Sequence, residues 1–228
     1  MAILPFSPIN QMRTLLHSDL RFDWKIITLT VVSTLLLMID HYHRLIPNEG
    51  LLGNFGSNWK AIDRIILYLI IPVLVTVFVF KEKPSNYGFH LGDWRAGVIL
   101  TLGGVVLMTP IIWLLGKSNA SMHGYYSNQI NIYTPVATFL DLFGWEFLFR
   151  GWLLFGYARK FGPDALWLQA VPCALMHIGK PEVETLSTIF GGFAFGWIAY
   201  RTRSFIYPFI IHWFIATFVI YVAAGFIG

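Results

Sequence analysis

Charged residues are scarce in this sequence, and cysteine is nearly absent. Asp, Glu, Lys and Arg make up 12% of the 228 residues, whereas 56% are hydrophobic and the mean hydropathy is +0.62. A chain with so little charge and so much apolar surface cannot fold as an ordinary soluble domain, so we predict a polytopic membrane protein. The one cysteine, Cys173, cannot form an internal disulfide and therefore indicates no redox compartment.

Several common signatures are also missing. The sequence contains neither GxSxG nor HExxH, which leaves a serine hydrolase of the nucleophile-elbow type and a zincin unsupported. Pro5, Pro8, Asn10 and Gln11 interrupt the amino-terminal segment, so we expect the first span to act as an uncleaved insertion signal. No internal repeat is evident, which argues against a transporter built from inverted repeats. No linker divides the chain, and residues 1–228 are expected to form a single integral membrane domain.

Apolar segments of sufficient length predict an all-α bundle of about seven transmembrane helices. A hydrocarbon core of ~30 Å requires about 20 residues of helix. Ahead of the first span, residues 10–23 mix apolar and charged side chains, as is typical of an amphipathic helix at the membrane interface. The segments that we interpret as spans, of which the first and fifth are short, are about 25–39, 62–80, 94–115, 133–158, 162–178, 183–202 and 205–227.

The distribution of Lys and Arg predicts the orientation in the membrane. With a cytoplasmic amino terminus, ten cations fall inside and five outside, which agrees with the positive-inside rule. We therefore expect an integral protein of the cell (inner) membrane, and we expect the lipid bilayer rather than nucleic acid to be the partner of these cations. The inner cations are Arg13, Arg21, Lys25, Lys81, Lys83, Arg95, Arg159, Lys160, Arg201 and Arg203, and the outer ones are Arg44, Lys60, Arg64, Lys117 and Lys180.

A carboxylate and a guanidinium stand in the middle of the fourth predicted span. Glu146 and Arg150 occur in the sequence Gly-Trp-Glu-Phe-Leu-Phe-Arg-Gly, residues 144–151. Each such charge costs roughly 2.5–3.5 kcal/mol at the centre of an inserted helix, so it normally faces protein or water and has a function. A spacing of four residues places the two on one helix face, where they can neutralise each other. The pair is either part of a functional site or a clamp between helices.

Three further ionisable side chains lie within the predicted spans. Asp141 is in the fourth span, His177 is near the end of the fifth, and His212 is in the seventh. With Glu146 and Arg150 they could form a proton relay, a metal site or a hydrolase.

Two smaller features have simpler interpretations. A thiol–imidazole pair of Cys173 and His177 lacks a third, orienting group and is disfavoured. Gly192 and Gly196 form a small-xxx-small pair, which we interpret as a site of close helix packing.

Four short motifs resemble those of the CAAX protease and bacteriocin-processing (CPBP/Abi) family of intramembrane glutamic peptidases. The family motif EExxxRG resembles residues 145–151, FxxxH resembles 173–177, FxxGxxxGxxxxxT resembles 189–202, and HxxxN is matched at His212 only. The resemblance covers about 133–216, the last four predicted spans, in the family's order. It implies a catalytic core in these four helices, with the catalytic residues Glu146, Arg150, His177 and His212.

The departures from the family pattern concern residues that carry the chemistry. The first Glu of the pair, to which water activation is usually assigned, is Trp145 here, and the Asn expected to help stabilise the oxyanion is Ala216, next to Thr217. Successive helix residues lie about 100° apart around the axis, so Glu146 cannot simply take the place of Trp145. Three alternatives stay open: a rotated helix with Glu146 as the base, which we prefer; Asp141, one turn earlier, as the base; or lost activity with a retained binding role.

The resemblance also implies a mechanism. Glu146 with His177 would deprotonate a water held between the helices, and His212 would stabilise or protonate the tetrahedral intermediate. The scheme requires no cofactor and no metal, although two histidines and a carboxylate could bind one. The implied substrate is a membrane-embedded or lipidated peptide or protein. Hypotheses of another class are an inactive homologue that acts as a binding, immunity or maturation partner, and a small proton-coupled transporter.

The depth of the three side chains gives a further expectation. Glu146 and His212 should lie level with each other, ~20 Å below the outer surface, at 1.5 Å per residue. His177 is close to the end of its span, so all three can share one water only if the chain turns inside the protein. We therefore predict that residues 178–181 form a buried turn that lines a wet cavity, because irregular backbone cannot face lipid.

Overall fold

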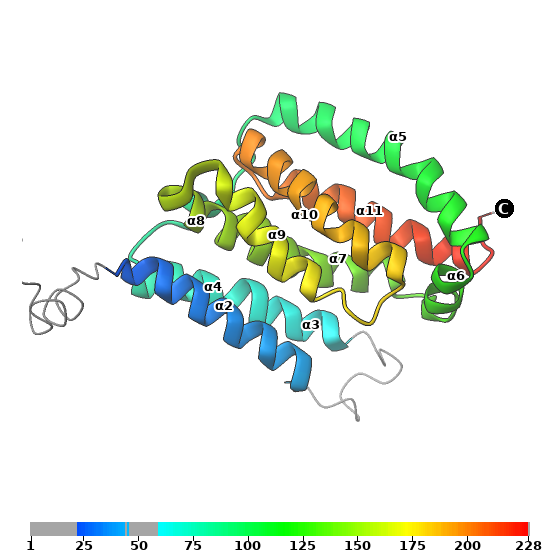
Figure 1. Cartoon of the computed structure of the whole chain (residues 1–228), viewed down its shortest axis with the longest axis horizontal. Helices are drawn as coiled ribbons and strands as arrows, with labels where there is room; N and C mark the ends of the chain where they lie inside the picture. Colours follow the sequence, from blue (N-terminus) through cyan, green and yellow to red (C-terminus); the bar gives the residue numbers. More distant parts are fainter. Residues whose placement is uncertain (1–21, 44, 46–58, 228) are drawn as a thin grey trace, which may run out of the picture.

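The computed structural model describes residues 22–43, 45 and 59–227, and it confirms the predicted all-α membrane bundle (Figure 1). All seven predicted spans correspond to helical rods, two of which contain π-helical turns. The predicted interfacial helix at 10–23 lies, except for its last two residues, outside the described part. The helices are α2 (Trp24–Tyr42), α3 (Trp59–Ile65) continuing into α4 (Ile71–Leu74) and to Val79, α5 (Trp94–Ser118), α6 (Ala120–Tyr126), α7 (Thr134–Glu146) continuing through Phe147–Leu153 into α8 (Leu154–Phe161), α9 (Ala165–Leu175), α10 (Glu182–Thr202) and α11 (Ile206–Ala223).

Helix length distinguishes α9 from the other predicted spans. Within the described residues, α2, the continuous helix Lys60–Val79, α5 and α11 are long and apolar enough to cross a bilayer by length and composition. The span predicted at 162–178 instead contains the 11-residue helix α9, which covers only about 16 Å at 1.5 Å per residue. His177 follows the end of α9 by two residues and is 5% exposed.

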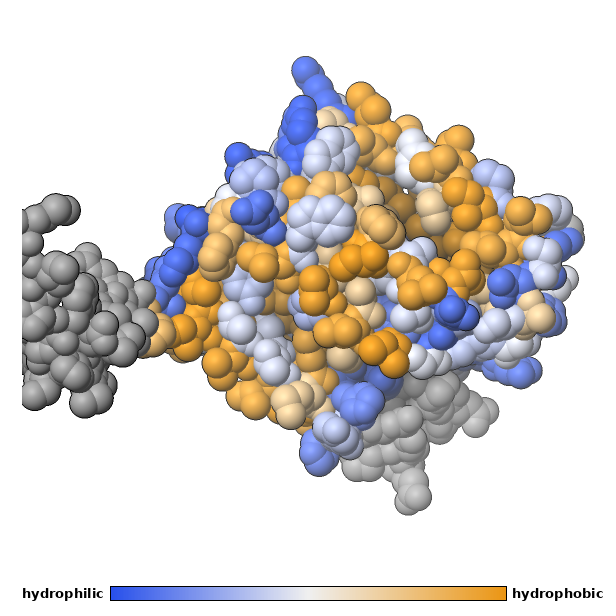
Figure 2. All heavy atoms as spheres, in the orientation of Figure 1, coloured by the Kyte–Doolittle hydropathy of each residue, from blue (hydrophilic) through white to orange (hydrophobic). Residues whose placement is uncertain are grey.

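The centre of the bundle is the rod formed by α7 and α8. Every residue from 144 to 156 is buried, and a helix that is enclosed on all sides belongs to the core. Within it, Phe147–Leu153 is π-helical, a local widening that occurs frequently at functional sites. In contrast, α5 packs mainly on α11 and exposes large apolar side chains such as Ile99 and Val106, as a lipid-facing helix does. Figure 2 shows how much of one face of the molecule is hydrophobic.

Glycines allow close contact between two pairs of helices, α3 with α7 and α9 with α10. A Cβ on Gly144 would lie 2.6 Å from the backbone oxygen of Arg64, so only glycine allows α7 to touch α3 here. On α10, Gly192 packs against Ala170, and Gly196 packs against Gln169 of α9. The Gln169 amide also donates a hydrogen bond of 2.8 Å to the Gly192 carbonyl. The close packing predicted for Gly192 and Gly196 is therefore present, with α9 as the partner.

Basic residues gather at the end of the bundle that contains the start of α2 and the α10–α11 connection (Figure 1). There Glu82 joins α2 to α8 through salt bridges with Lys25 and Arg159. Partial burial alone would raise the pKa of Glu82, but the hydrogen bonds from the two cations outweigh it and hold that pKa below its usual range. Lys117 and Lys180 lie at the opposite end, near α6 and the start of α10.

This arrangement leads to a test of the predicted orientation. Successive spans cross the membrane in opposite directions. We therefore expect single cysteines replacing Lys83 and Arg203 to be labelled only from the cytoplasm, and a cysteine replacing Lys117 to be labelled only from outside. An impermeant thiol reagent applied to intact cells and to inverted vesicles measures this. The native Cys173 is 1% exposed and provides an unreactive background. Labelling of Arg203→Cys from outside would overturn the orientation.

Candidate active site

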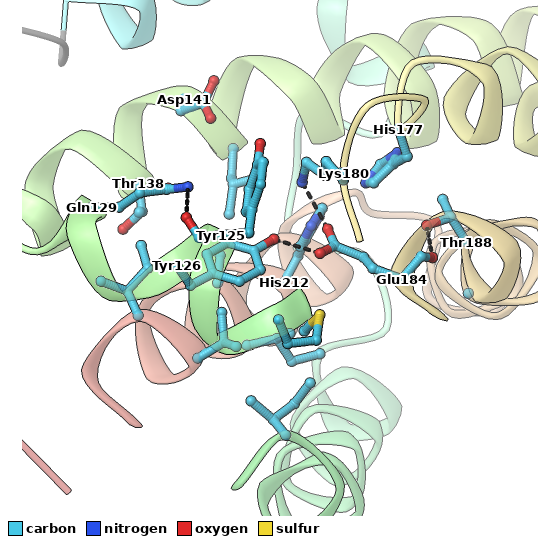
Figure 3. A pocket seen from close by; sticks show the side chains of 18 of the residues that line it. Tyr125, Tyr126, Gln129, Thr138, Asp141, His177, Lys180, Glu184, Thr188 and His212 are labelled. Atoms are coloured by element: carbon cyan, nitrogen blue, oxygen red, sulfur yellow. Dashed lines mark hydrogen bonds and ion pairs between the residues drawn. The ribbon is translucent and has the colours of Figure 1, made fainter. Parts of the chain in front are cut away.

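A cavity of about 680 Å³ lies between the later helices, on the side of the bundle that contains α6 (Figure 3). One wall is largely apolar and comes from α5, α6 and the carboxyl-terminal half of α11, with residues such as Ile112, Met122 and Val219. The opposite wall contains most of the ionisable side chains that the sequence placed within spans. The polar residues of this wall include Arg64, Asp141, Arg150, His177, Lys180, Glu184 and His212.

Glu146 is the last residue of α7 before the π-helical segment, and its side chain is completely buried. One carboxylate oxygen, Oε1, lies 3.1 Å from Nη1 of Arg150 and 2.6 Å from Nδ1 of His212 on α11. The other oxygen, Oε2, has no hydrogen-bond partner among the described residues. The spacing of Glu146 and Arg150 thus produces the predicted ion pair. The histidine in direct contact with Glu146 is His212 and not His177.

Arg150 connects this pair to α9 and α10. Its Nη1 group lies 3.3 Å from the Cys173 sulfur, and its guanidinium stands 5.6 Å from the ring centroid of Phe195. A guanidinium buried to this degree needs a counter-charge, which Glu146 supplies. The thiol of Cys173 therefore faces Arg150, and the disfavoured thiol–imidazole pair with His177 does not form.

His177 is fixed by its own turn of the chain. Its Nδ1 lies 2.8 Å from the Cys173 carbonyl oxygen, which can only accept, so Nδ1 carries the proton. The other ring nitrogen, Nε2, is then an acceptor, which is the form that a general base requires. The His177 carbonyl in turn accepts hydrogen bonds from the Lys180 N–H (3.0 Å) and the Thr185 hydroxyl (2.8 Å).

The turn predicted at residues 178–181 is present, but its predicted burial is wrong. Gly179 adopts a φ of +98°, which glycine tolerates and other residues rarely do. Pro181 is buried, whereas Ile178 is 72% exposed and Gly179 is exposed. The hydrogen bonds to the His177 carbonyl satisfy much of the turn internally, so an apolar side chain such as Ile178 can point outward.

Trp145 occupies the place beside His177. The two rings meet edge to face, with centroids 5.5 Å apart, and the indole is 4% exposed. On its other side, the Arg64 guanidinium stands 4.9 Å from the indole centroid. Asp141, the alternative base, lines the cavity but is bound to Arg64 at 2.7 Å.

Arg64 is a residue that the sequence interpretation misplaced. We counted it among the outer cations, but it lies within α3 with a side chain only 15% exposed. It binds Asp40 of α2 at 3.2 Å as well as Asp141 of α7. These partners are far apart in the chain, and no spacing rule connects them. The only signal was that each of these three charged residues lies within a predicted span or directly beside one.

The residues near the missing family Asn do not replace it. Ala216 lines the cavity, and the hydroxyl of the neighbouring Thr217 is hydrogen bonded to that of Thr138 at 2.8 Å. Because Thr138 also bonds the Thr134 carbonyl, both hydroxyls are engaged in holding α7 to α11. Sequence reasoning also missed the part of the polar wall that comes from the start of α10. There the Glu184 carboxylate accepts a hydrogen bond from Tyr126 and pairs with Lys180 (Figure 3).

The described residues contain no group of three or more His, Cys, Asp or Glu side chains placed to hold a metal ion. The site as built is a set of two imidazoles on one cavity wall, one backed by a carboxylate and one by a backbone carbonyl. Such an arrangement can accept a proton at one nitrogen and stabilise negative charge at the other.

Comparison with known proteins gives a family match for part of the chain. Residues 127–218 match the family described as type II CAAX prenyl endopeptidase Rce1-like, which confirms the resemblance predicted from the motifs. The chain is also 25% identical over 101 residues to the uracil permease of Paenibacillus larvae subsp. larvae. That alignment covers 43% of this chain and 24% of the permease, so the chain spans about a quarter of that relative's length. No solved structure matches the chain.

The ion pair at the centre of the site gives a stability prediction. We expect Arg150→Leu to lower the free energy of unfolding by ~3–5 kcal/mol, because it leaves the buried carboxylate of Glu146 without its counter-charge. Thermal or denaturant unfolding in detergent measures the change. The double variant Glu146→Gln/Arg150→Leu removes the unpaired charge and should recover part of the loss. A fully stable Arg150→Leu protein would contradict the pairing.

Proposed function

We propose that the protein is an intramembrane endopeptidase of the glutamic CAAX protease/bacteriocin-processing type, on the basis of the match between residues 127–218 and the Rce1-like family of type II CAAX prenyl endopeptidases. Its substrate is a membrane-embedded or lipidated peptide or protein. The match with the permease is too distant and too partial to favour the transporter hypothesis.

The observation that carries this proposal is the cavity that contains both histidines. His177 and His212 line one space of about 680 Å³ within an otherwise apolar bundle, which is large enough for a peptide segment and a water. The apolar wall from α5, α6 and α11 suits a hydrophobic portion of the substrate, and the polar wall suits its peptide bond.

Water activation is assigned to His177 in this proposal. Its Nε2 accepts one proton of a cavity water while the water oxygen attacks the carbonyl carbon of the peptide bond. The hydrogen bond from Nδ1 to the Cys173 carbonyl supports the protonated ring that results. The resemblance implied that Glu146 activates the water together with His177. Glu146 instead contacts His212, so in this proposal it contributes through His212.

Stabilisation of the intermediate is assigned to His212. Nδ1 of this ring lies 2.6 Å from the Glu146 carboxylate, which orients the imidazole, and the step uses the imidazolium form of His212. The charged ring donates from Nε2 to the oxyanion. The intermediate then breaks at its C–N bond, and the amine leaves with the proton that His177 returns. Arg150 contacts the same carboxylate oxygen at 3.1 Å and holds it beside His212.

A second candidate function rests on Trp145. This indole stands against His177 at the position where the family carries its water-activating Glu. A chain that lost this carboxylate could bind a membrane peptide in the same cavity without cleaving it. Cleavage assays separate the two functions.

We expect Glu146→Gln, His177→Gln and His212→Gln each to lower the rate of peptide cleavage by at least about 100-fold, the usual contribution of one proton-transfer group. The measurement uses purified protein in liposomes with fluorogenic lipidated peptides. Asp141→Asn serves as the control and should keep most of the activity, because that carboxylate is bound to Arg64. Loss of activity in Asp141→Asn, with Glu146→Gln active, would transfer the role to Asp141.

The variant Trp145→Glu tests the second candidate. If the chain is an endopeptidase that works without the family's first Glu, the wild-type protein cleaves peptides and Trp145→Glu changes the rate and its pH dependence. If the chain is a binding protein, the wild type binds the same peptides without hydrolysis. Binding is measured by quenching of a labelled peptide, so both outcomes are read in one liposome preparation.

A further inference from the structure

The residue that breaks the family motif has structural contacts of its own. Trp145 is 4% exposed and contacts two side chains of different kind, the Arg64 guanidinium and the His177 imidazole. The indole edge-to-face contact with His177 has an interplanar angle of 84°. Such geometry is favourable between aromatic rings and defines the relative orientation of the two planes.

Arg64 forms salt bridges with two carboxylates, so the position of its guanidinium beside Trp145 is restrained. Asp40 of α2 contacts it at 3.2 Å and Asp141 of α7 at 2.7 Å. Asp141 lies one helical turn before Trp145, so the carboxylate and the indole reach Arg64 from the same face of α7. The cation–π contact at 4.9 Å then fixes the face of the indole.

His177 has one anchored nitrogen and one packed face as a result. The Cys173 carbonyl binds Nδ1, and the Trp145 ring restricts rotation of the imidazole about its Cβ–Cγ bond. Both restraints are needed, because a single hydrogen bond at Nδ1 still allows the ring plane to tilt. With both, Nε2 keeps one direction relative to the cavity that His177 lines.

We infer that Trp145, supported by Arg64, is a positioning residue for His177: it holds the imidazole in the orientation and tautomer in which Nε2 accepts a proton from the cavity side. The inference rests on the proposed function for its effect on rate, but the orientation of the ring is a property of the fold. Trp145 is not a catalytic residue in this scheme, since it touches the base and not the substrate.

The test compares substitutions that keep or remove the ring. Trp145→Phe retains an edge-to-face partner and should keep kcat within about threefold, whereas Trp145→Leu should lower kcat by about 10- to 100-fold with little change in KM, the scale of a misplaced catalytic group. Arg64→Lys keeps the charge but loses the planar contacts and should fall between them. Trp152→Phe is the matched control, because Trp152 is equally buried on the same rod and stacks on Phe80.

A spectroscopic readout keeps the inference separate from the activity. Nitrogen NMR of isotopically labelled histidine in detergent distinguishes the neutral Nδ1–H form from the other tautomer, and the His177 signal is assigned by its loss in His177→Gln. We expect the Nδ1–H form in the wild type, Trp145→Phe and Trp152→Phe, and a mixture of tautomers in Trp145→Leu. An unchanged His177 signal in Trp145→Leu overturns the inference, as does an equal effect of Trp152→Phe. If no variant cleaves peptide but the tautomer shifts as expected, the proposed function fails and the positioning role stands.

Discussion

The burial of Glu146 inside an apolar bundle is the constraint on which the rest of the site depends. A carboxylate with no exposed surface requires cationic or hydrogen-bonding partners, and for Glu146 these come from two different helical segments. Arg150 reaches it from the next turn of the same rod, and His212 reaches it from α11. Arg150 in turn contacts the Cys173 thiol, so α9 is drawn to the same point. The carboxylate therefore fixes the relative positions of the helices that carry both histidines.

A second buried charge group works in parallel on the other side of Trp145. Arg64 satisfies Asp40 and Asp141, and these three residues come from α2, α3 and α7. The close approach of α3 to α7 is possible because Gly144 presents no side chain to the Arg64 backbone. Trp145 thus packs against the charge group that joins α2, α3 and α7, and it directly precedes Glu146 of the other charge group in the chain. This explains how an indole can be accommodated at a position that the family gives to a carboxylate.

The sequence predicted features that depend on residues close together in one helix better than features that depend on packing between helices. Hydrophobic length predicted the helical rods, and the spacing of Glu146 and Arg150 predicted their ion pair, because both follow from helix geometry. The contact between Glu146 and His212 was expected only from their equal depth. The partners of Arg64 could not be predicted, since they depend on how three helices pack. The exposure of Ile178 was missed because we assumed that the turn needed cover, whereas it satisfies its own backbone.

The state of His177 distinguishes a working site from a retained fold. Stability alone explains why Glu146, Arg150 and His212 persist together, because removal of one leaves another as an uncompensated buried group. No such demand applies to His177, whose ring makes one hydrogen bond to a backbone carbonyl and could be replaced by an apolar side chain packed on Trp145. The structure nevertheless surrounds it with restraints: two donors fix its carbonyl, the Cys173 oxygen fixes one nitrogen, and its other nitrogen remains an acceptor on a residue that lines the cavity. These restraints on a residue that lines the cavity support the proposed catalytic role of His177.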